Sequence, residues 1–215
     1  MIFIGMDLSG PSNYKETALV AFKESKTGYL ALHKSLQGAD DNDILNFTRS
    51  LLQLDKNIVV GIDAPLSYND GGGDRVSDAD LRKKIISTGL RSGSVMAPTM
   101  NRMVYLTLRG ISIARLLLAI NTTTRIVEVH PGAAMALRGS AINDVAGFKK
   151  NKKSRVRLLA WLEKQGLIHA ADINDPSAHY VVACASALAA WKWHHNKSVW
   201  IHPAKQPLHP FDYVC

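Results

Sequence analysis

Residues 2–10 read IFIGMDLSG, an apolar run that ends in Asp7 and is followed by a serine, a glycine and Pro11. A short, fully apolar run bounded by turn-forming residues is typical of a buried strand. The sequence therefore predicts a buried strand over residues 2–7, with a carboxylate at its carboxyl end.

Two further strands are expected at residues 17–22 and 29–36, because the polar segment between them has the composition of a hairpin connection. With the first strand they would form a three-strand meander. Asp41 or Asn42 can cap a helix that continues to about residue 54, since apolar residues recur there at steps of three and four. That helix should cover one face of the sheet.

Two more apolar runs resemble the first one and end in the same way. Residues 58–62 (IVVGI) precede Asp63, and residues 125–129 (RIVEV) contain Glu128. A proline closes each run shortly afterwards, and proline cannot donate to a continuing strand ladder. Carboxylates therefore recur at three predicted strand ends.

The stretch 67–123 interrupts this strand pattern. It contains three consecutive glycines, a helix predicted to begin at Ser77 with Asp80 as its capping-box partner, and a second helix through about residue 120. We interpret the chain as a single domain over 1–215 with a helical insertion at about 67–123.

The last third of the chain is mainly helical. A short helix is expected near residues 133–137, and a basic helix over 155–164 should end at Gly166. Asp175, followed by a proline, is a typical helix start, and the apolar run after it predicts a mostly buried helix. Residues 199–201 are a candidate edge strand.

Composition narrows the class of protein. The 215 residues include 26 Lys and Arg against 18 Asp and Glu, a net charge of +8, which favours anionic partners. At 47% hydrophobic and 20% charged residues the chain is globular rather than disordered. An actin-like phosphotransferase, in which residues 7–10 would form a phosphate loop, needs a second loop and a second domain that this length does not provide.

The cysteine content and the hydropathy of the sequence indicate where in the cell the protein is expected. Only two cysteines occur, Cys184 and Cys215, so neither a disulfide framework nor a cysteine metal cluster is expected. The first ten residues lack a basic leader, and no apolar run is long enough to span a bilayer. We expect a cytoplasmic protein with no membrane partner.

In open sheets of this kind, ligands collect at the carboxyl ends of the strands, where Asp7, Asp63 and Glu128 are expected. Three clustered carboxylates repel one another unless a divalent cation neutralises them, and Mg²⁺ or Mn²⁺ prefers such oxygen ligands. Two such ions can activate a water and stabilise the leaving oxygen in phosphodiester hydrolysis.

The chain resembles the domain-of-unknown-function 429 family over most of its length. The resemblance lies in GMDLSG, GIDAPL, GGGDR, DADLR, EVHPGA and DPSAHYVVACASALAAW. That family is described as predicted nucleases with a ribonuclease H fold. The resemblance implies a ribonuclease H-like α/β fold, a mixed sheet flanked by helices, in which Asp7, Asp63 and Glu128 occupy the metal-binding positions.

The chain departs from the family in its last long helix. Members commonly carry a fourth acidic residue there, whereas this chain has Val182 and Ala183 at the corresponding place. His179, one turn earlier, or Asp175 could take over that role. Both are therefore candidate catalytic residues.

Basic side chains are candidates for binding phosphate. Arg75 and Arg82 flank the first helix of the insertion, where they could clamp a phosphate or pair with neighbouring aspartates. A second group lies in the basic segment 149–157, namely Lys149, Lys150, Lys152, Lys153 and Arg155.

These observations predict a nuclease that depends on Mg²⁺ or Mn²⁺ and hydrolyses DNA or RNA. Two alternatives stay open. One is a non-catalytic nucleic-acid-binding protein on the same fold, which would bind without cleaving. The other is an enzyme acting on a small phosphorylated or nucleotide substrate, which would need a deep, enclosed pocket.

Overall fold

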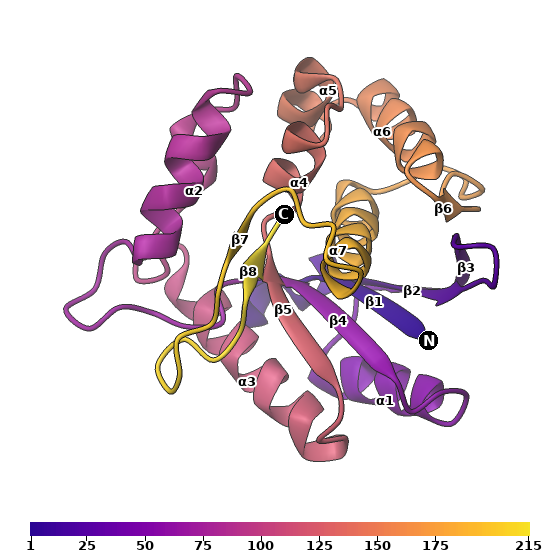
Figure 1. Ribbon diagram of the computed structural model, residues 1–215, viewed down its shortest axis with the longest axis horizontal. Coiled ribbons are helices and arrows are strands. Elements are labelled where there is room, and N and C mark those ends of the chain that lie inside the picture. The colour runs from indigo at the N-terminus through magenta and orange to yellow at the C-terminus, as the bar shows by residue number, and fades with distance from the viewer.

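A mixed sheet forms the centre of the molecule, which is described here for residues 1–215 by a computed structural model. β1 (Ile2–Asp7), β2 (Ala18–Glu24) and β3 (Leu30–Gln37) form an antiparallel meander. β4 (Ile58–Asp63) and β5 (Arg125–Val129) run parallel to β1. This arrangement confirms the predicted mixed sheet, a three-strand meander with further parallel strands (Figure 1).

Three strands of two residues each extend the sheet at its edges. They give the order β6-β3-β2-β1-β4-β5-β8-β7. The predicted edge strand at 199–201 is displaced, and a strand from the end of the chain lies between it and β5. Two-residue strands have no periodicity from which to predict them. The three are β6 (Leu167–Ile168), β7 (Ile201–His202) and β8 (Tyr213–Val214).

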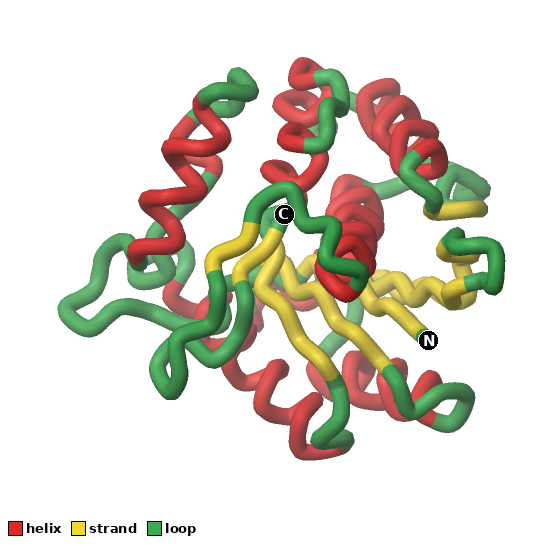
Figure 2. Tube along the Cα trace, in the orientation of Figure 1, coloured by secondary structure: helices red, strands yellow, loops and turns green.

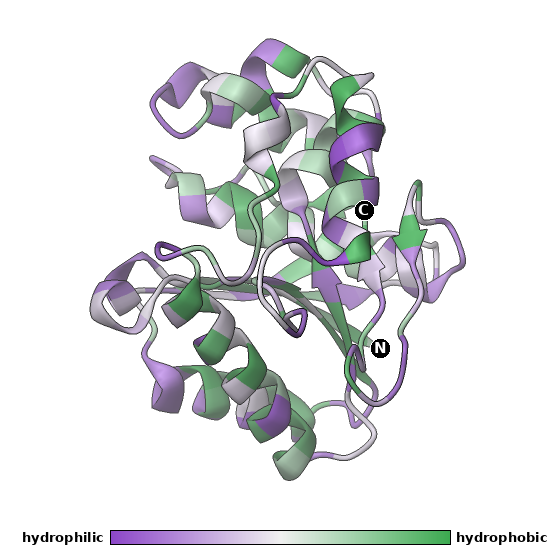
Figure 3. Ribbon diagram, turned by 90° about the vertical axis from the view of Figure 1, so that its left-hand side faces the viewer, coloured by the Kyte–Doolittle hydropathy of each residue, from purple (hydrophilic) through white to green (hydrophobic).

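Helices cover both faces of the sheet (Figure 3). α7 (Ala178–His194) lies directly on one face, whereas α1 (Asp41–Leu52) and α3 (Val104–Ile120) cover the other. None of these helices combines the length and the apolar composition that a transmembrane span requires. The remaining helices are α2 (Val76–Ile86), α4 (Pro131–Leu137), α5 (Ile142–Gly147), α6 (Lys152–Lys164) and the 3-10 turns η1 (Pro11–Glu16) and η2 (Ser92–Ser94).

Two glycines let α7 approach the sheet closely. A Cβ atom added at Gly5 of β1 would lie 1.9 Å from the carbonyl oxygen of Ala183. One added at Gly61 of β4 would lie 2.4 Å from the carbonyl oxygen of Ser186. Because real Cβ contacts are never this short, the missing side chains set the height of α7 above β1 and β4.

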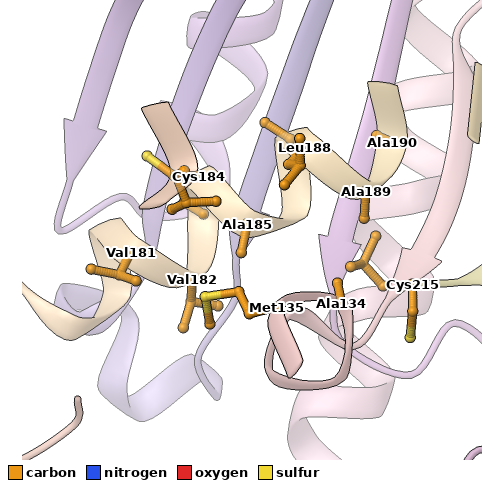
Figure 4. Close-up of a cluster of buried hydrophobic side chains, with 14 of the residues drawn as sticks. Ala134, Met135, Val181, Val182, Cys184, Ala185, Leu188, Ala189, Ala190 and Cys215 are labelled. Atoms are coloured by element: carbon orange, nitrogen blue, oxygen red, sulfur yellow. The ribbon is translucent and has the colours of Figure 1, made fainter. Parts of the chain in front are cut away.

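The other side of α7 packs into an apolar layer (Figure 4). Met135 of α4 and residues of α7 such as Leu188 lie in one buried cluster. Val182, at the position where the family commonly has an acid, belongs to this cluster and is 6% exposed. Cys184 and Cys215 are buried there as free thiols. Val182 is therefore a core-packing residue.

Two predicted helix starts are wrong by a few residues. α1 is capped by Asp40 instead of Asp41 or Asn42, since the Asp40 side chain accepts the amide of Asp43 and the Asp43 side chain accepts that of Asp40. α7 is capped by Ser177, whose hydroxyl accepts the amide of Tyr180. In both helices the actual cap is a neighbour of the predicted residue whose side-chain oxygen accepts a backbone amide of the first turn.

Asp175, the predicted cap of α7, lies before the helix with a positive φ of 54°. The predicted capping box of Ser77 and Asp80 is wrong as well. At the start of α2 the Asp78 side chain instead accepts the backbone amide of Arg75, and it also pairs with the buried Arg75 guanidinium. α6 begins three residues before the predicted residue 155, and α5 was not predicted from the sequence.

The connections between these elements hold much of the polar sequence. Residues 87–103, between α2 and α3, and residues 203–212, between β7 and β8, form the long loops drawn green in Figure 2.

Part of the segment 67–123 lies in the core. Ile113, Ala114 and Leu117 of α3 belong to the same buried cluster as α1. This part of the segment 67–123 thus helps to build the core.

Candidate active site

Asp7 and Asp63 lie side by side at the carboxyl end of the sheet. They are register partners in the parallel pair of β1 and β4. Neighbouring strands lie about 4.8 Å apart, and register partners point to the same face. The structure therefore places two carboxylates next to one another beneath the start of α7.

His179 reaches this pair from the first turn of α7. Its Nδ1 atom lies 2.8 Å from Oδ2 of Asp7. The His179 side chain is 38% exposed, and the only hydrogen bond of its ring is the one at Nδ1. The structure thus brings together three of the predicted catalytic residues, Asp7, Asp63 and His179.

The two carboxylates differ in their partners. Asp7 is held by His179, whereas no hydrogen bond acts on the Asp63 side chain. Burial, and then the negative charge of Asp7, raise the pKa of Asp63 well above its ordinary value. Burial also raises the pKa of Asp7, against the opposing effect of the His179 hydrogen bond. Asp63 is therefore the carboxylate that accepts no hydrogen bond within the chain.

The Asp7 carboxylate acts on His179 in return. The hydrogen bond that His179 donates to Asp7 raises the pKa of His179 above 6.5, against the opposing effect of burial. The nearby Glu16, in η1, raises it further. Glu16 was not identified from the sequence, because a residue in a 3-10 turn carries no motif and no periodic signal.

One lysine of the basic segment also lies at this site. The positive charge of Lys149, in the connection from α5 to α6, lowers the pKa of both Asp7 and Asp63. Lys150 and Lys153 are exposed beside it. The site is therefore bordered by free positive charge on the side of α6.

The other predicted basic residues of this segment have partners within the chain. Lys152 pairs with Asp175, with 2.8 Å between Nζ and Oδ1. Arg155 donates to the carbonyl oxygen of Phe148 over 3.1 Å. Asp175 is thus held in an exposed ion pair and is not joined to Asp7 or Asp63 by any contact.

Glu128 is not part of this carboxylate pair. Its register partner in β4 is Ile62, one residue before Asp63, and successive residues of a strand point to opposite faces. Both of its oxygens are occupied, because Arg75 donates to them over 2.5 and 2.7 Å and the amide of Leu66 donates over 2.8 Å. The expected cluster of three carboxylates is therefore not formed, and no group of three metal-ligating side chains is present.

The two arginines predicted to clamp phosphate are engaged within the chain. Arg75 is 4% exposed and makes ion pairs with Glu128 and Asp78. Arg82 pairs with Asp74 and donates to the carbonyl oxygen of Val95 over 2.9 Å. The ion pair of Arg75 with Glu128 connects the start of α2 to β5, and the hydrogen bond of Arg82 to Val95 connects α2 to the loop before α3.

Replacing Arg75 with methionine should destabilise the fold strongly. The change leaves the buried carboxylates of Glu128 and Asp78 without a cation, a loss of about 3–5 kcal/mol in the free energy of unfolding. Arg82→Met is the matched control, because its pair with Asp74 is partly exposed and contributes at most about 1 kcal/mol. Urea denaturation of both variants measures the difference, and equal losses would contradict a structural role for Arg75.

The fold and the site define a mixed α/β protein with two carboxylates and a histidine at the carboxyl ends of two neighbouring strands, β1 and β4. Residues 5–206 match the family described as "Protein of unknown function (DUF429)", and the chain belongs to this family. It is also similar to T. thermophilus RuvC, solved in complex with a Holliday junction substrate. The identity is 11%, the TM-score is 0.45, and the match covers 92% of this chain and 98% of that one. Among curated proteins, nothing matches the sequence.

Proposed function

We propose that this protein is a divalent-metal-dependent nuclease that hydrolyses phosphodiester bonds at the site of Asp7, Asp63 and His179. The observation that carries the proposal is the pair of carboxylates in register, one of which has no donor within the chain. Two adjacent carboxylates, only one of them compensated, are a destabilising arrangement unless a cation binds.

The residues fit a hard cation such as Mg²⁺ or Mn²⁺. Oδ1 of Asp7 and both oxygens of Asp63 are available, and carboxylate oxygens are the ligands these ions prefer. Glu128 is held by Arg75 on the opposite face, so these residues support a single ion rather than the two expected from the sequence. When bound, such an ion polarises a phosphoryl oxygen.

His179 is placed to move a proton. Its Nδ1 contact with Asp7 fixes the ring, and the raised pKa keeps the imidazole protonated nearer to neutral pH. Nε2 can then donate its proton to the leaving oxygen of the scissile phosphodiester, which is general acid catalysis. Asp7 thus orients the histidine and stabilises its charged form.

The surroundings favour a nucleic acid as the substrate. Lys149 places positive charge beside the carboxylates, and Lys150 and Lys153 are exposed in the same basic segment, in a chain with a net charge of +8. Such a surface binds a phosphate backbone with an affinity that falls steeply as salt rises. This supports nucleic-acid binding for both the catalytic proposal and its non-catalytic alternative, which differ only in cleavage.

Calorimetric titration of Mn²⁺ tests the metal site directly. We expect saturable binding of one ion per chain to the wild type and at least a tenfold loss of affinity in Asp7→Asn. Asp70→Asn, which changes an exposed carboxylate in a loop, is the control and should bind like the wild type.

The same three proteins are then incubated with single-stranded, duplex and branched DNA and RNA. Metal-dependent cleavage by the wild type and Asp70→Asn, but not by Asp7→Asn, would support the nuclease. If the wild type binds no ion, or cleaves nothing while binding nucleic acid, the catalytic proposal is wrong.

A further inference from the structure

The outward side of α3 is apolar although no part of the chain covers it. With α1, this helix forms the layer below the sheet in Figure 3. Tyr105 is 69% exposed, Leu108 is 55% exposed and Leu116 is 38% exposed. With two small exposed residues they form a stripe in steps of three, four, four and three residues: Tyr105, Leu108, Ser112, Leu116 and Ala119.

This α3 stripe is a continuous surface. With 3.6 residues per turn, its five positions fall within an arc of about 80° around the helix axis. The one charged neighbour on this side is Arg115, which lies at the margin of the arc, where its head group reaches water. A contiguous exposed apolar surface of this kind is typical of a protein contact.

The stripe is symmetric about Ser112, which is also the midpoint of α3 (Val104–Ile120). If two copies of α3 pack antiparallel about a two-fold axis at Ser112, each residue faces the one equally far from Ser112 on the other side. Leu108 then faces Leu116 of the second copy, and the large Tyr105 faces the small Ala119. Ser112 faces itself, and its small side chain lets the two helices approach. The stripe is therefore complementary to itself.

The two ends of α3 carry complementary charge in the same arrangement. Arg102, in the turn before α3, is exposed and makes no ion pair. At the other end, the carbonyl groups of residues 118–120 accept no hydrogen bond within the chain, and the last turn has no basic residue. Such free carbonyls make the end of a helix negative. In the antiparallel pair, Arg102 of each copy lies beside this end of the other.

We propose that α3 is a dimerisation helix, which pairs antiparallel with α3 of a second copy of this chain. One side of a helix about 25 Å long buries less than the roughly 800 Å² per partner of a standard interface, so we expect a weak dimer with a micromolar Kd. Because α3 and α7 lie on opposite faces of the sheet, the proposal does not depend on the nuclease activity.

Sedimentation equilibrium of the full chain, at concentrations from about 1 to 500 µM, tests the pairing. Leu108→Lys and Leu116→Glu should each weaken dimerisation at least tenfold, because each places a charge against an apolar side chain twice per dimer. The double variant should dimerise more tightly than either single one, since lysine then faces glutamate in both halves. Lys26→Glu, in the exposed turn after β2, is the control and should dimerise like the wild type.

Disulfide trapping tests the register of the two helices. Ser112→Cys should form a covalent dimer on mild oxidation, because its two thiols meet at the two-fold axis. Ala119→Cys is the matched control on the same stripe, since its two thiols lie about 21 Å apart along the helices and should stay unlinked. Cys184 and Cys215 are buried and do not compete.

Three results would overturn the proposal. They are a wild type that stays monomeric over the whole range, a double variant no better than the single ones, and equal crosslinking of Ser112→Cys and Ala119→Cys. A monomeric wild type that binds phosphatidylcholine vesicles, with binding lost in Leu116→Glu, would assign the stripe to a lipid surface instead.

Discussion

Asp63→Asn is expected to make the metal-free protein more stable at neutral pH while abolishing metal binding and cleavage. The Asp63 carboxylate lies beside that of Asp7 and has no donor to compensate it. An amide removes the negative charge and its repulsion, for a gain of about 1–2 kcal/mol in the free energy of unfolding at pH 7. A residue whose removal stabilises the fold is typical of a functional site.

The pH dependence has a defined sign. The pKa of Asp63 is higher in the folded chain than its ordinary value of 3.8, so the folded state binds this proton more tightly than the unfolded state does. The stability that this proton provides is present below pH 3.8 and is lost as the pH rises through the folded-state pKa. The advantage of Asp63→Asn over the wild type should therefore be near zero at pH 3.5 and grow toward pH 7.

Urea denaturation at several pH values, with and without Mg²⁺, measures these effects. Mg²⁺ should stabilise the wild type but leave Asp63→Asn unchanged, because only the wild type binds the ion in its folded state. Cleavage by the variant should fall at least about 100-fold. A variant that is less stable than the wild type at pH 7 would show that Asp63 makes a structural contact instead.

The sequence predicts the two-carboxylate part of this site for a clear reason. Asp7 and Asp63 each follow a short apolar run and precede turn residues, so their positions at the strand ends are visible in the sequence. Both runs also carry a glycine two residues before the aspartate, at Gly5 and Gly61. Their common role, the close approach of α7, becomes evident only when the helix is placed.

Glu128 shows where such reasoning fails. It lies one residue before the end of its strand, and an offset of one residue moves a side chain to the opposite face. The ion pair that holds it comes from Arg75, 53 residues earlier in the chain. A strand end alone does not specify the face, and no local pattern predicts a partner at that separation.

The role of His179 is likewise not visible in the local sequence. A histidine in the first turn of a helix is unremarkable in sequence, and the capping residue was placed two positions too early at Asp175. The residue reaches Asp7 because α7 crosses β1 at the height that the two glycines allow. The geometry of the site is therefore set by residues that never touch a substrate.

Gly5→Ala should consequently disrupt both the fold and the site. The added methyl would lie 1.9 Å from the Ala183 carbonyl oxygen, so α7 or β1 must move. We expect a loss of about 3 kcal/mol or more in the free energy of unfolding. Gly61→Ala, at 2.4 Å from the Ser186 carbonyl oxygen, should act in the same direction with a smaller effect.

Gly10→Ala is the matched control for this substitution. Gly10 has an extended backbone with a φ of −62°, and no atom lies within 4 Å of an added Cβ. Alanine there should change stability by less than about 0.5 kcal/mol, since nothing has to move. Thermal and urea unfolding of the three variants compare the close approach of α7 with an open position in the same segment.

The pKa of His179 provides a second measurement, which a loss of stability alone does not change. If α7 is displaced in the folded Gly61→Ala variant, the contact between Nδ1 and Asp7 lengthens. The pKa of His179, which that contact raises, then falls toward 6.5 in an NMR titration, whereas it stays raised in Gly10→Ala. An unchanged pKa in a destabilised Gly61→Ala variant would mean that the glycines support packing alone and that the Asp7–His179 pair is held independently of them.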